Sequence, residues 1–197
     1  MKYINKIENY LKNSGGIITS AYCRENGIPT VYLTRLVKSG KLERVDTGIY
    51  VTENGDYDEL YFFQYKYKNT IYSYETAMYL LGITDKIIQV KDVTVSASYK
   101  FNNQPTDIQV HYVKKDIFEL GVENAKTMFG NPVRVYSYER IICDFILNKE
   151  NMDPESYTKL LREYKNYKNK DIHNLYKIAD KMDITDKVRE IMEVIYE

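Results

Sequence analysis

Side chains able to recognise nucleic acid recur between residues 30 and 44 of this chain. The residues concerned are Thr30, Tyr32, Arg35, Lys38, Lys41 and Arg44. Hydroxyl and guanidinium groups can hydrogen-bond to base edges in a DNA groove, whereas basic groups neutralise phosphates. The first three residues are predicted to reach base edges and the last three to hold phosphates. The alternative for each of them is a solvated protein surface.

The surrounding sequence predicts the scaffold that would present these side chains. Two helical patterns, Ser20–Asn26 and Thr30–Ser39, are separated by Gly27-Ile28-Pro29, a turn length that suits a helix-turn-helix. Two short strand patterns, Leu42–Val45 and Ile49–Val51, follow and are joined by a loop that contains glycine. Helix, turn, helix and hairpin together predict a winged helix-turn-helix DNA-binding domain over residues 1–52.

A first amphipathic helix is expected to complete the core of this domain. Ile4, Ile7 and Leu11 recur at helical spacing and should pack behind the two following helices. Lys2 and Lys6 lie beside this apolar stripe, and both are predicted as further contacts to DNA.

The charge of the chain is unevenly distributed. The whole sequence carries 28 basic and 28 acidic side chains, so its net charge is zero. Residues 1–51 contain eight Lys or Arg and four Asp or Glu, so this segment is positive and the remainder is negative. This division is typical of a nucleic-acid-binding domain joined to a domain with another role.

Neither a membrane span nor a metal site is predicted. No apolar run approaches the roughly 20 residues of a membrane helix, and the N-terminus does not resemble a signal peptide, so a cytoplasmic location is expected. Cys23 and Cys143 lie in separate helical patterns without the spacing of a zinc site, and we expect both to be buried thiols. We expect no cofactor.

Residues 56–197 predict a second domain after the linker Glu53–Asp56. Its strand patterns are Val93–Ala97, Ile108–Tyr112 and Val133–Tyr136, with a turn at Asn102–Pro105 between the first two. Helical patterns cover Tyr57–Tyr67, Ser73–Leu81, Tyr138–Lys149, Asp171–Met182 and Thr185–Tyr196, and another begins at Pro154 after the N-cap Asp153. The expected class is α+β: an N-terminal winged helix-turn-helix, then a small antiparallel sheet and a helical C-terminal half.

The strongest enzymatic candidate is a nuclease site. Acids such as Glu75 and Asp107 can hold Mg²⁺, and the pair Lys114-Lys115 could assist catalysis. The usual close acid–x–Lys arrangement is missing, because Gln109 and His111 occupy the same-face positions after Asp107. We therefore expect no enzymatic activity, and we expect His111 to lie at the surface.

A polar motif opens the pattern Tyr138–Lys149 and consists of Tyr138, Glu139, Arg140 and Asp144. Arg140 and Asp144 are i, i+4 neighbours that can pair, and Glu139 would lie near the positive end of the helix. The alternative is that Arg140 faces RNA. A basic stripe on the next helix, which is either a solvated face or a nucleic-acid contact, contains Lys159, Arg162, Lys165 and Lys168.

Two segments of the chain resemble a known family. The sequence GIPTVYLTRLVKSGKLERVDTGIYV resembles the winged-helix domain of AbiEi-type transcriptional regulators from bacterial abortive-infection systems. Downstream, VRVYSYERIICDFILNKENMD and the helical sequence that follows resemble the C-terminal antitoxin domain of these proteins. Many regulators share the winged helix, so YSYERIICD is the more specific part of the resemblance, which covers nearly the whole chain.

The resemblance implies an antitoxin of a type IV toxin–antitoxin pair that acts in phage defence. The implied partner toxin is a nucleotidyltransferase, which the C-terminal domain counters without a stable complex. The N-terminal domain would repress the shared promoter by binding inverted repeats in double-stranded DNA.

The resemblance also assigns residues. DNA-binding roles carry over to Arg35, Lys38, Lys41 and Arg44, and membership of the antitoxin motif carries over to Tyr138, Glu139, Arg140 and Asp144. The recognition helix departs from a strongly basic pattern, because only Arg35 and Lys38 are charged there. Affinity is therefore expected to depend also on Lys2, Lys6, the wing and cooperative binding.

Two other interpretations remain open. One is a winged-helix regulator whose C-terminal domain senses a ligand or only oligomerises, and a Tyr-lined pocket with convergent polar groups would favour it. The other is a nuclease targeted to DNA, which a metal-binding cluster around Glu75 and Asp107 would favour.

Overall fold

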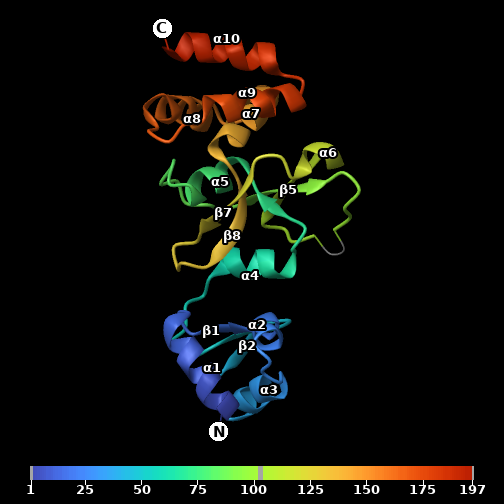
Figure 1. The fold of residues 1–197 in the computed structure, drawn as a ribbon, viewed down its shortest axis with the longest axis vertical. Coiled ribbons are helices and arrows are strands. Elements are labelled where there is room, and N and C mark those ends of the chain that lie inside the picture. The colour runs from blue at the N-terminus through green and yellow to red at the C-terminus, as the bar shows by residue number, and fades with distance from the viewer. Residues whose placement is uncertain (1, 102–103, 197) are drawn as a thin grey trace. The chain divides into compact units, whose positions relative to one another are not determined.

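The computed structural model describes residues 2–101 and 104–196. It divides into two compact units, each built from helices and a sheet (Figure 1). The first unit contains the chain up to Tyr67 together with Lys126–Asn131, and the second contains Lys68–Ala125 and the chain from Pro132 onward. The boundary therefore follows Tyr67 and not the expected linker at Glu53–Asp56.

The first unit has four helices and three strands among its described residues. They are α1 (Lys2–Asn13), β1 (Ile17–Thr19), α2 (Ser20–Glu25), α3 (Val31–Lys38), β2 (Glu43–Asp46), β3 (Ile49–Val51) and α4 (Glu59–Lys66). The strands form an antiparallel sheet in the order β1-β3-β2. The helix-turn-helix and hairpin segments thus have the expected element types, and β1 is an additional strand that was not predicted.

Local sequence explains where these helices begin. The Thr19 side chain accepts a hydrogen bond from the Tyr22 amide at 3.1 Å and caps α2. Gly27 lies between α2 and α3 with a φ of 64°, a left-handed conformation that costs glycine little. The Asp58 side chain accepts from the Tyr61 amide at 3.1 Å and caps α4.

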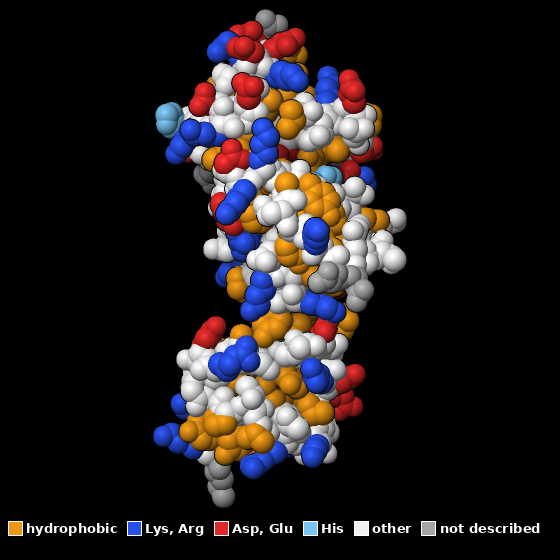
Figure 2. Space-filling view, turned by 90° about the vertical axis from the view of Figure 1, so that its right-hand side faces the viewer, with side chains coloured by type: hydrophobic (Ala, Val, Ile, Leu, Met, Phe, Trp, Pro, Cys, Tyr) orange, Lys and Arg blue, Asp and Glu red, His pale blue; other side chains and the backbone are white. Residues whose placement is uncertain are grey.

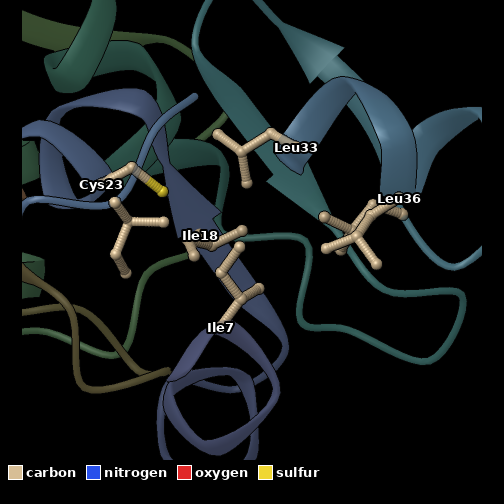
Figure 3. Packing of buried hydrophobic residues seen from close by; sticks show 7 residues of the cluster. Ile7, Ile18, Cys23, Leu33 and Leu36 are labelled. Atoms are coloured by element: carbon tan, nitrogen blue, oxygen red, sulfur yellow. The ribbon is translucent and has the colours of Figure 1, made fainter. Parts of the chain in front are cut away.

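Apolar side chains from the first four elements meet in one core. Figure 3 shows Ile7 of α1, Ile18 of β1, Cys23 of α2 and both Leu33 and Leu36 of α3 directed toward one another. All five are buried. This packing fixes one face of α3, so its opposite face is left for solvent or a partner.

Helix α4 belongs to the first unit, although the sequence placed it in the second domain. Phe62 packs with Ile17, Ile49 and Val51 in a second apolar cluster of this unit. The Tyr65 hydroxyl accepts a hydrogen bond from the Ala21 amide at 3.2 Å. These long-range contacts join the helix to the strands that precede it, and no local pattern reports them.

The second unit contains a five-stranded sheet and a helical C-terminal half. Its elements are β4 (Ile71–Tyr72), α5 (Tyr74–Leu80), β5 (Lys91–Ser96), β6 (Ile108–Val113), α6 (Lys115–Phe118), β7 (Val122–Lys126), β8 (Pro132–Tyr136), α7 (Tyr138–Leu147), the 3₁₀ turn η1 (Lys149–Asn151), α8 (Pro154–Asn166), α9 (Ile172–Lys181) and α10 (Thr185–Tyr196). The strand order is β6-β5-β4-β8-β7. The α+β class and the helical C-terminal half are confirmed.

The antiparallel sheet expected in this unit is wrong in detail, because the sheet is mixed. β5 pairs with β6 in parallel, with Lys91 opposite Ile108 and Ser96 opposite Val113, and β4 also pairs with β8 in parallel. Alternating burial reports which face of a strand is covered but not the direction of its neighbour. Of the turn expected at Asn102–Pro105, residues 102 and 103 lie outside the described residues.

Helices α7, α8, α9 and α10 pack against one another beyond the sheet (Figure 1). Ser137 caps α7 by accepting from the Arg140 amide at 3.3 Å, and Asp153 caps α8 by accepting from the Ser156 amide at 3.0 Å. The cap at Asp153 agrees with the sequence analysis. No helix within the described ranges is both long enough and apolar enough to cross a membrane.

Candidate nucleic-acid interface

The solvent face of α3 carries the predicted base-reading residues. Leu33 and Leu36 are buried in the core, whereas Thr30, Arg35 and Lys38 are exposed. The Thr30 side chain forms no capping hydrogen bond to the helix. Its hydroxyl and the two basic groups can therefore contact a ligand laid along this face.

Tyr32 has a different environment from the other predicted base-reading residues. Its ring is half-buried and lies 5.3 Å from the ring of Tyr3 on α1. The Arg35 guanidinium lies over the same ring, 5.1 Å from its centre. An exposed cation–π contact of this kind is worth about 0.5–1 kcal/mol. The geometry suits Tyr32 for holding Arg35 in position, and Tyr3 is a supporting residue that the sequence analysis missed.

The basic residues of the hairpin already have protein partners. Lys41 Nζ lies 3.0 Å from Glu8 Oε1 on α1, and both side chains are largely exposed. Arg44 Nε donates to the carbonyl of Asp46 at 3.3 Å, where the β2–β3 register shifts. Exposed ion pairs contribute about 0–1 kcal/mol, so a phosphate can compete with Glu8 for Lys41.

Asp46 fixes the base of this hairpin. Its carboxylate accepts from the Thr47 amide at 2.6 Å and pairs with Lys66 of α4 at 3.0 Å. The amide hydrogen bond, followed by the Lys66 ammonium, lowers the pKa of Asp46. The carboxylate of Asp46, which lies between Arg44 and the turn, is thus already paired with Lys66 within the unit.

Lys2 and Lys6 are exposed on α1, whereas Ile7 of the same helix is buried. Arg24, in the last turn of α2, is exposed as well and was not predicted as a contact. Figure 2 shows basic side chains spread over one face of the first unit. The structure therefore gives every predicted basic residue of this unit a solvent-accessible position.

The motif at the start of α7 is buried inside the second unit. Tyr138, Glu139, Arg140 and Asp144 are all at most 6% exposed. Tyr138 donates its hydroxyl hydrogen to the Leu160 carbonyl at 3.0 Å. Glu139 accepts from the Tyr164 hydroxyl at 3.3 Å and from the Asp171 amide at 3.1 Å. These residues tie α7 to α8 and to the start of α9.

Arg140 has no exposed surface, so the alternative that it faces RNA is wrong in this structure. Its Nε donates to Asp144 Oδ1 at 3.0 Å, as the i, i+4 spacing predicts. Its Nη1 donates to the carbonyls of Ile117 at 2.6 Å and Leu120 at 2.7 Å. The guanidinium also lies 4.1 Å from the centre of the Tyr136 ring.

Gly121 makes this arrangement possible. Its φ is 74°, and a Cβ at this position would lie 2.7 Å from Cβ of Arg140. Any larger residue would push the arginine out of its site. Burial raises the pKa of Asp144, although the Arg140 guanidinium opposes this shift. The pair is therefore sustained by its hydrogen bonds against the cost of removing two charges from water.

The residues proposed for a nuclease site do not come together. Glu75 pairs with Lys86 at 3.0 Å and accepts from the Ser156 hydroxyl at 2.7 Å. Asp107 pairs with Lys91, and this ammonium lowers the pKa of Asp107. Within the described ranges no three His, Cys, Asp or Glu side chains are grouped to hold a metal ion.

His111 was expected at the surface, and this is wrong. Its Nε2 lies 2.8 Å from Asp92 Oδ1, and its ring centre lies 4.0 Å from that of Tyr74. The aromatic ring from α5 covers the strand face that alternation had left to solvent. Cys23 and Cys143 are free and buried, as expected.

Comparisons with known proteins bear mainly on the first unit. Residues 5–52 match the model of a family described as a transcriptional regulator, AbiEi antitoxin. This match confirms the AbiEi-type resemblance over the segment that contains α1 to β3. No curated protein matches the chain.

A solved structure has a fold similar to most of this chain. The crystal structure of the RV2827C protein from Mycobacterium tuberculosis is similar to this chain with a TM-score of 0.54. The sequence identity is 10%, and the similarity covers 91% of this chain and 72% of the other. At this identity the likeness shows the α+β fold alone.

Proposed function

We propose, on the premise that residues 5–52 belong to the AbiEi family of antitoxins and transcriptional regulators, that this chain represses its own operon. In this proposal the first unit binds inverted repeats in the promoter. The second unit counters a nucleotidyltransferase toxin from the same type IV operon, without forming a stable complex. The observation that carries the DNA-binding part is α3, which buries Leu33 and Leu36 and exposes Arg35 and Lys38.

The proposed DNA contact of each residue on this surface follows from the position of its side chain and from its contacts within the protein. Arg35, supported by Tyr32, presents a planar set of donors that suits the edge of a guanine, and Thr30 adds a hydroxyl at the start of α3. Lys38, Lys41 and Arg44 are assigned to phosphates, and Lys2 and Lys6 extend the basic surface along α1. Phosphate contacts supply most of the affinity, and Arg35 supplies the sequence preference.

Arg35→Ala is expected to weaken binding to the protein's own upstream DNA by about 1–3 kcal/mol. The loss should be smaller on unrelated DNA, because a base contact discriminates between sequences. Fluorescence anisotropy with labelled duplexes of both kinds measures the two affinities at fixed salt. Lys177→Ala is the matched control, since Lys177 is exposed on α9 of the second unit, which is not assigned to DNA binding.

Equal losses for Arg35→Ala on both duplexes would make Arg35 a phosphate contact and not a base reader. No loss on either duplex would remove α3 from the interface. Lys41→Ala and Arg44→Ala provide the comparison, since each should weaken both duplexes alike.

The antitoxin role is tested in cells that express the neighbouring nucleotidyltransferase gene. The full chain, supplied from an independent promoter, is expected to restore growth. The Arg35→Ala chain should restore it equally, because neutralisation is assigned to the second unit. Failure of both proteins to restore growth, with both present as folded protein, would leave a regulator without antitoxin activity.

A second function is favoured by one feature of the second unit. This unit contains a pocket lined by Tyr138 and Tyr167 together with convergent polar groups. Such a pocket supports a regulator whose second unit senses a small molecule, and the two functions are compatible in one chain.

A further inference from the structure

A pocket of about 670 Å³ opens in the second unit. It lies where the end of α5, strand β7, the start of α7, the end of α8 and the start of α9 meet. Its volume falls within the roughly 300–1,000 Å³ of small-molecule sites. The pocket is thus large enough for a whole small ligand and not only for a few waters.

The lining of this pocket is strongly acidic. Its carboxylates are Glu123, Glu139, Glu163 and Asp171, and Lys168 is the basic residue that lines it. Glu163 has an ion pair with Arg162 at 3.6 Å, and Arg162 is not part of the lining. No other ion pair joins these four carboxylates to a base among the described residues. The pocket therefore carries net negative charge, from one buried carboxylate, Glu139, and three that are exposed to water.

Glu139 supplies a buried acceptor with spare capacity. The residue is 6% exposed, and its Oε1 accepts both of the hydrogen bonds that it forms, from Tyr164 and from Asp171. Its Oε2 has no hydrogen-bond donor within the described part of the chain. This oxygen is not among the fully buried atoms that lack a partner, so it contacts water in the pocket, and a ligand N–H that enters can donate to it in place of water.

Glu123 lies on β7 and faces the same pocket. The side chain of Glu123 is exposed at the pocket, and partial burial, followed by the negative charge of Glu139, raises the pKa of Glu123. Two carboxylates that repel each other across a cavity are stabilised by a cation placed between them.

Aromatic rings add a second attraction for a cation. Tyr138 and Tyr167 line the pocket, and their ring centres are 5.0 Å apart. The hydroxyl of Tyr138 is engaged with the Leu160 carbonyl, which fixes that ring. The face of a tyrosine ring attracts ammonium and guanidinium groups within about 6 Å.

Two helices begin at the pocket, and helix N-termini favour anions. Here, however, a protein side chain already accepts from one amide in the first turn of each helix. Ser137 accepts from the Arg140 amide at the start of α7, and Asp171 accepts from the Asn174 amide at 2.9 Å at the start of α9. The acidic side chains, and not the helix N-termini, therefore determine which ligand charge this pocket favours.

We propose that this pocket binds a small organic cation that carries at least two ammonium or guanidinium groups, such as a polyamine. One cationic group would contact Glu139 and Glu123, and another would lie against the Tyr138 and Tyr167 rings. This site is independent of the DNA-binding surface of the first unit, so its test needs no DNA and does not depend on the proposed repressor role.

Isothermal titration of the full chain with spermidine tests the proposal. Saturable one-to-one binding is expected, whereas a neutral diol of similar length should give no binding. Mg²⁺ at the same concentration controls for unspecific attraction to acidic protein and should not compete. Equal binding of Mg²⁺, or the absence of spermidine binding, would overturn the proposal.

Variants then locate the site. Glu123→Gln should weaken spermidine binding at least fivefold, and adding Glu163→Gln should weaken it further. Glu123→Gln should keep the fold, since the Glu123 side chain is exposed on β7, and the circular dichroism spectrum checks this. Glu193→Gln is the matched control, because Glu193 is exposed on α10 and outside the pocket. Equal affinity in Glu123→Gln and Glu193→Gln would place the binding elsewhere and refute the assignment.

Discussion

Arg140→Ala is expected to lower the free energy of unfolding by about 3–5 kcal/mol, the range for breaking a buried ion pair by removing one partner. The substitution leaves the buried Asp144 carboxylate without its Arg140 Nε donor, and it leaves the carbonyls of Ile117 and Leu120 without Nη1. It also opens a cavity beside the ring of Tyr136. Urea denaturation measures the effect as a shift in midpoint at constant slope.

Arg189→Ala is the matched control for this experiment. Arg189 is exposed on α10 and pairs with Asp186 at 2.9 Å, so its removal should cost about 0–1 kcal/mol. A similar small cost for Arg140→Ala would mean that the guanidinium is not buried as the structure describes.

Exchanging the residues at positions 140 and 144 tests whether stability depends on the Arg140–Asp144 ion pair alone or also on the other hydrogen bonds of Arg140. From sequence spacing alone, Arg140→Asp combined with Asp144→Arg should restore much of the lost stability. The structure indicates otherwise, because Arg140 also donates to the carbonyls of Ile117 and Leu120. An arginine at position 144 is not placed to donate to these carbonyls. We therefore expect little recovery in the double variant. Toxin neutralisation should follow the amount of folded protein in each variant, since Arg140 contacts no solvent.

The first unit could be predicted well because its signals are local. Gly27 with its positive φ separates α2 from α3, and the apolar spacing of Leu33 and Leu36 gives the buried face of α3. Exposure of Arg35 and Lys38 follows from that spacing. The ion pair of Lys41 with Glu8 cannot be predicted from this spacing, since the two residues are 33 positions apart and meet only through the packing of α1.

The second unit could be predicted less well, for physical reasons. β4 has two residues, too few for any periodicity, although it joins β5 to β8 at the centre of the sheet. The direction of the β5–β6 pair depends on the chain between them and not on alternation.

The buried motif and the acidic pocket were hidden for a related reason. Arginine at the start of a helix is usually solvated, and nothing local reveals that Ile117 and Leu120 offer it carbonyls. Likewise Glu123 and Glu139 are far apart in sequence, and the strand and helix that carry them must be packed before the carboxylates face one cavity. Sequence patterns predict the helices and strands, whereas the buried motif and the acidic pocket form only when these elements pack together.

Replacing Arg35, Lys38, Lys41 and Arg44 together by alanine is expected to weaken binding to promoter DNA by at least about 100-fold. One base contact and three phosphate contacts are lost at once. Each phosphate contact contributes about 0.9 to the slope of log affinity against log salt, so that slope should become shallower by about 2.7. Titrations at several salt concentrations measure both quantities. Because all four side chains are exposed and their contacts with Tyr32 and Glu8 are each worth about 1 kcal/mol or less, the variant should unfold at only a slightly lower urea concentration than the unsubstituted chain.

Glu8→Gln provides a control of opposite sign for the same surface. Glu8 holds Lys41 at 3.0 Å in the free protein, so phosphate binding must displace this carboxylate. Removing its charge should strengthen binding to all duplexes alike, without changing sequence preference.

Unchanged binding by the fourfold alanine variant would exclude α3 and the β2–β3 hairpin as the DNA contact. If Glu8→Gln strengthened binding while the fourfold variant lost only affinity and kept its salt slope, the four residues would act through sequence contacts and not through phosphates. The expected combination of a large loss, a shallower slope and a gain from Glu8→Gln is what a phosphate-anchored α3 with one base-reading arginine requires.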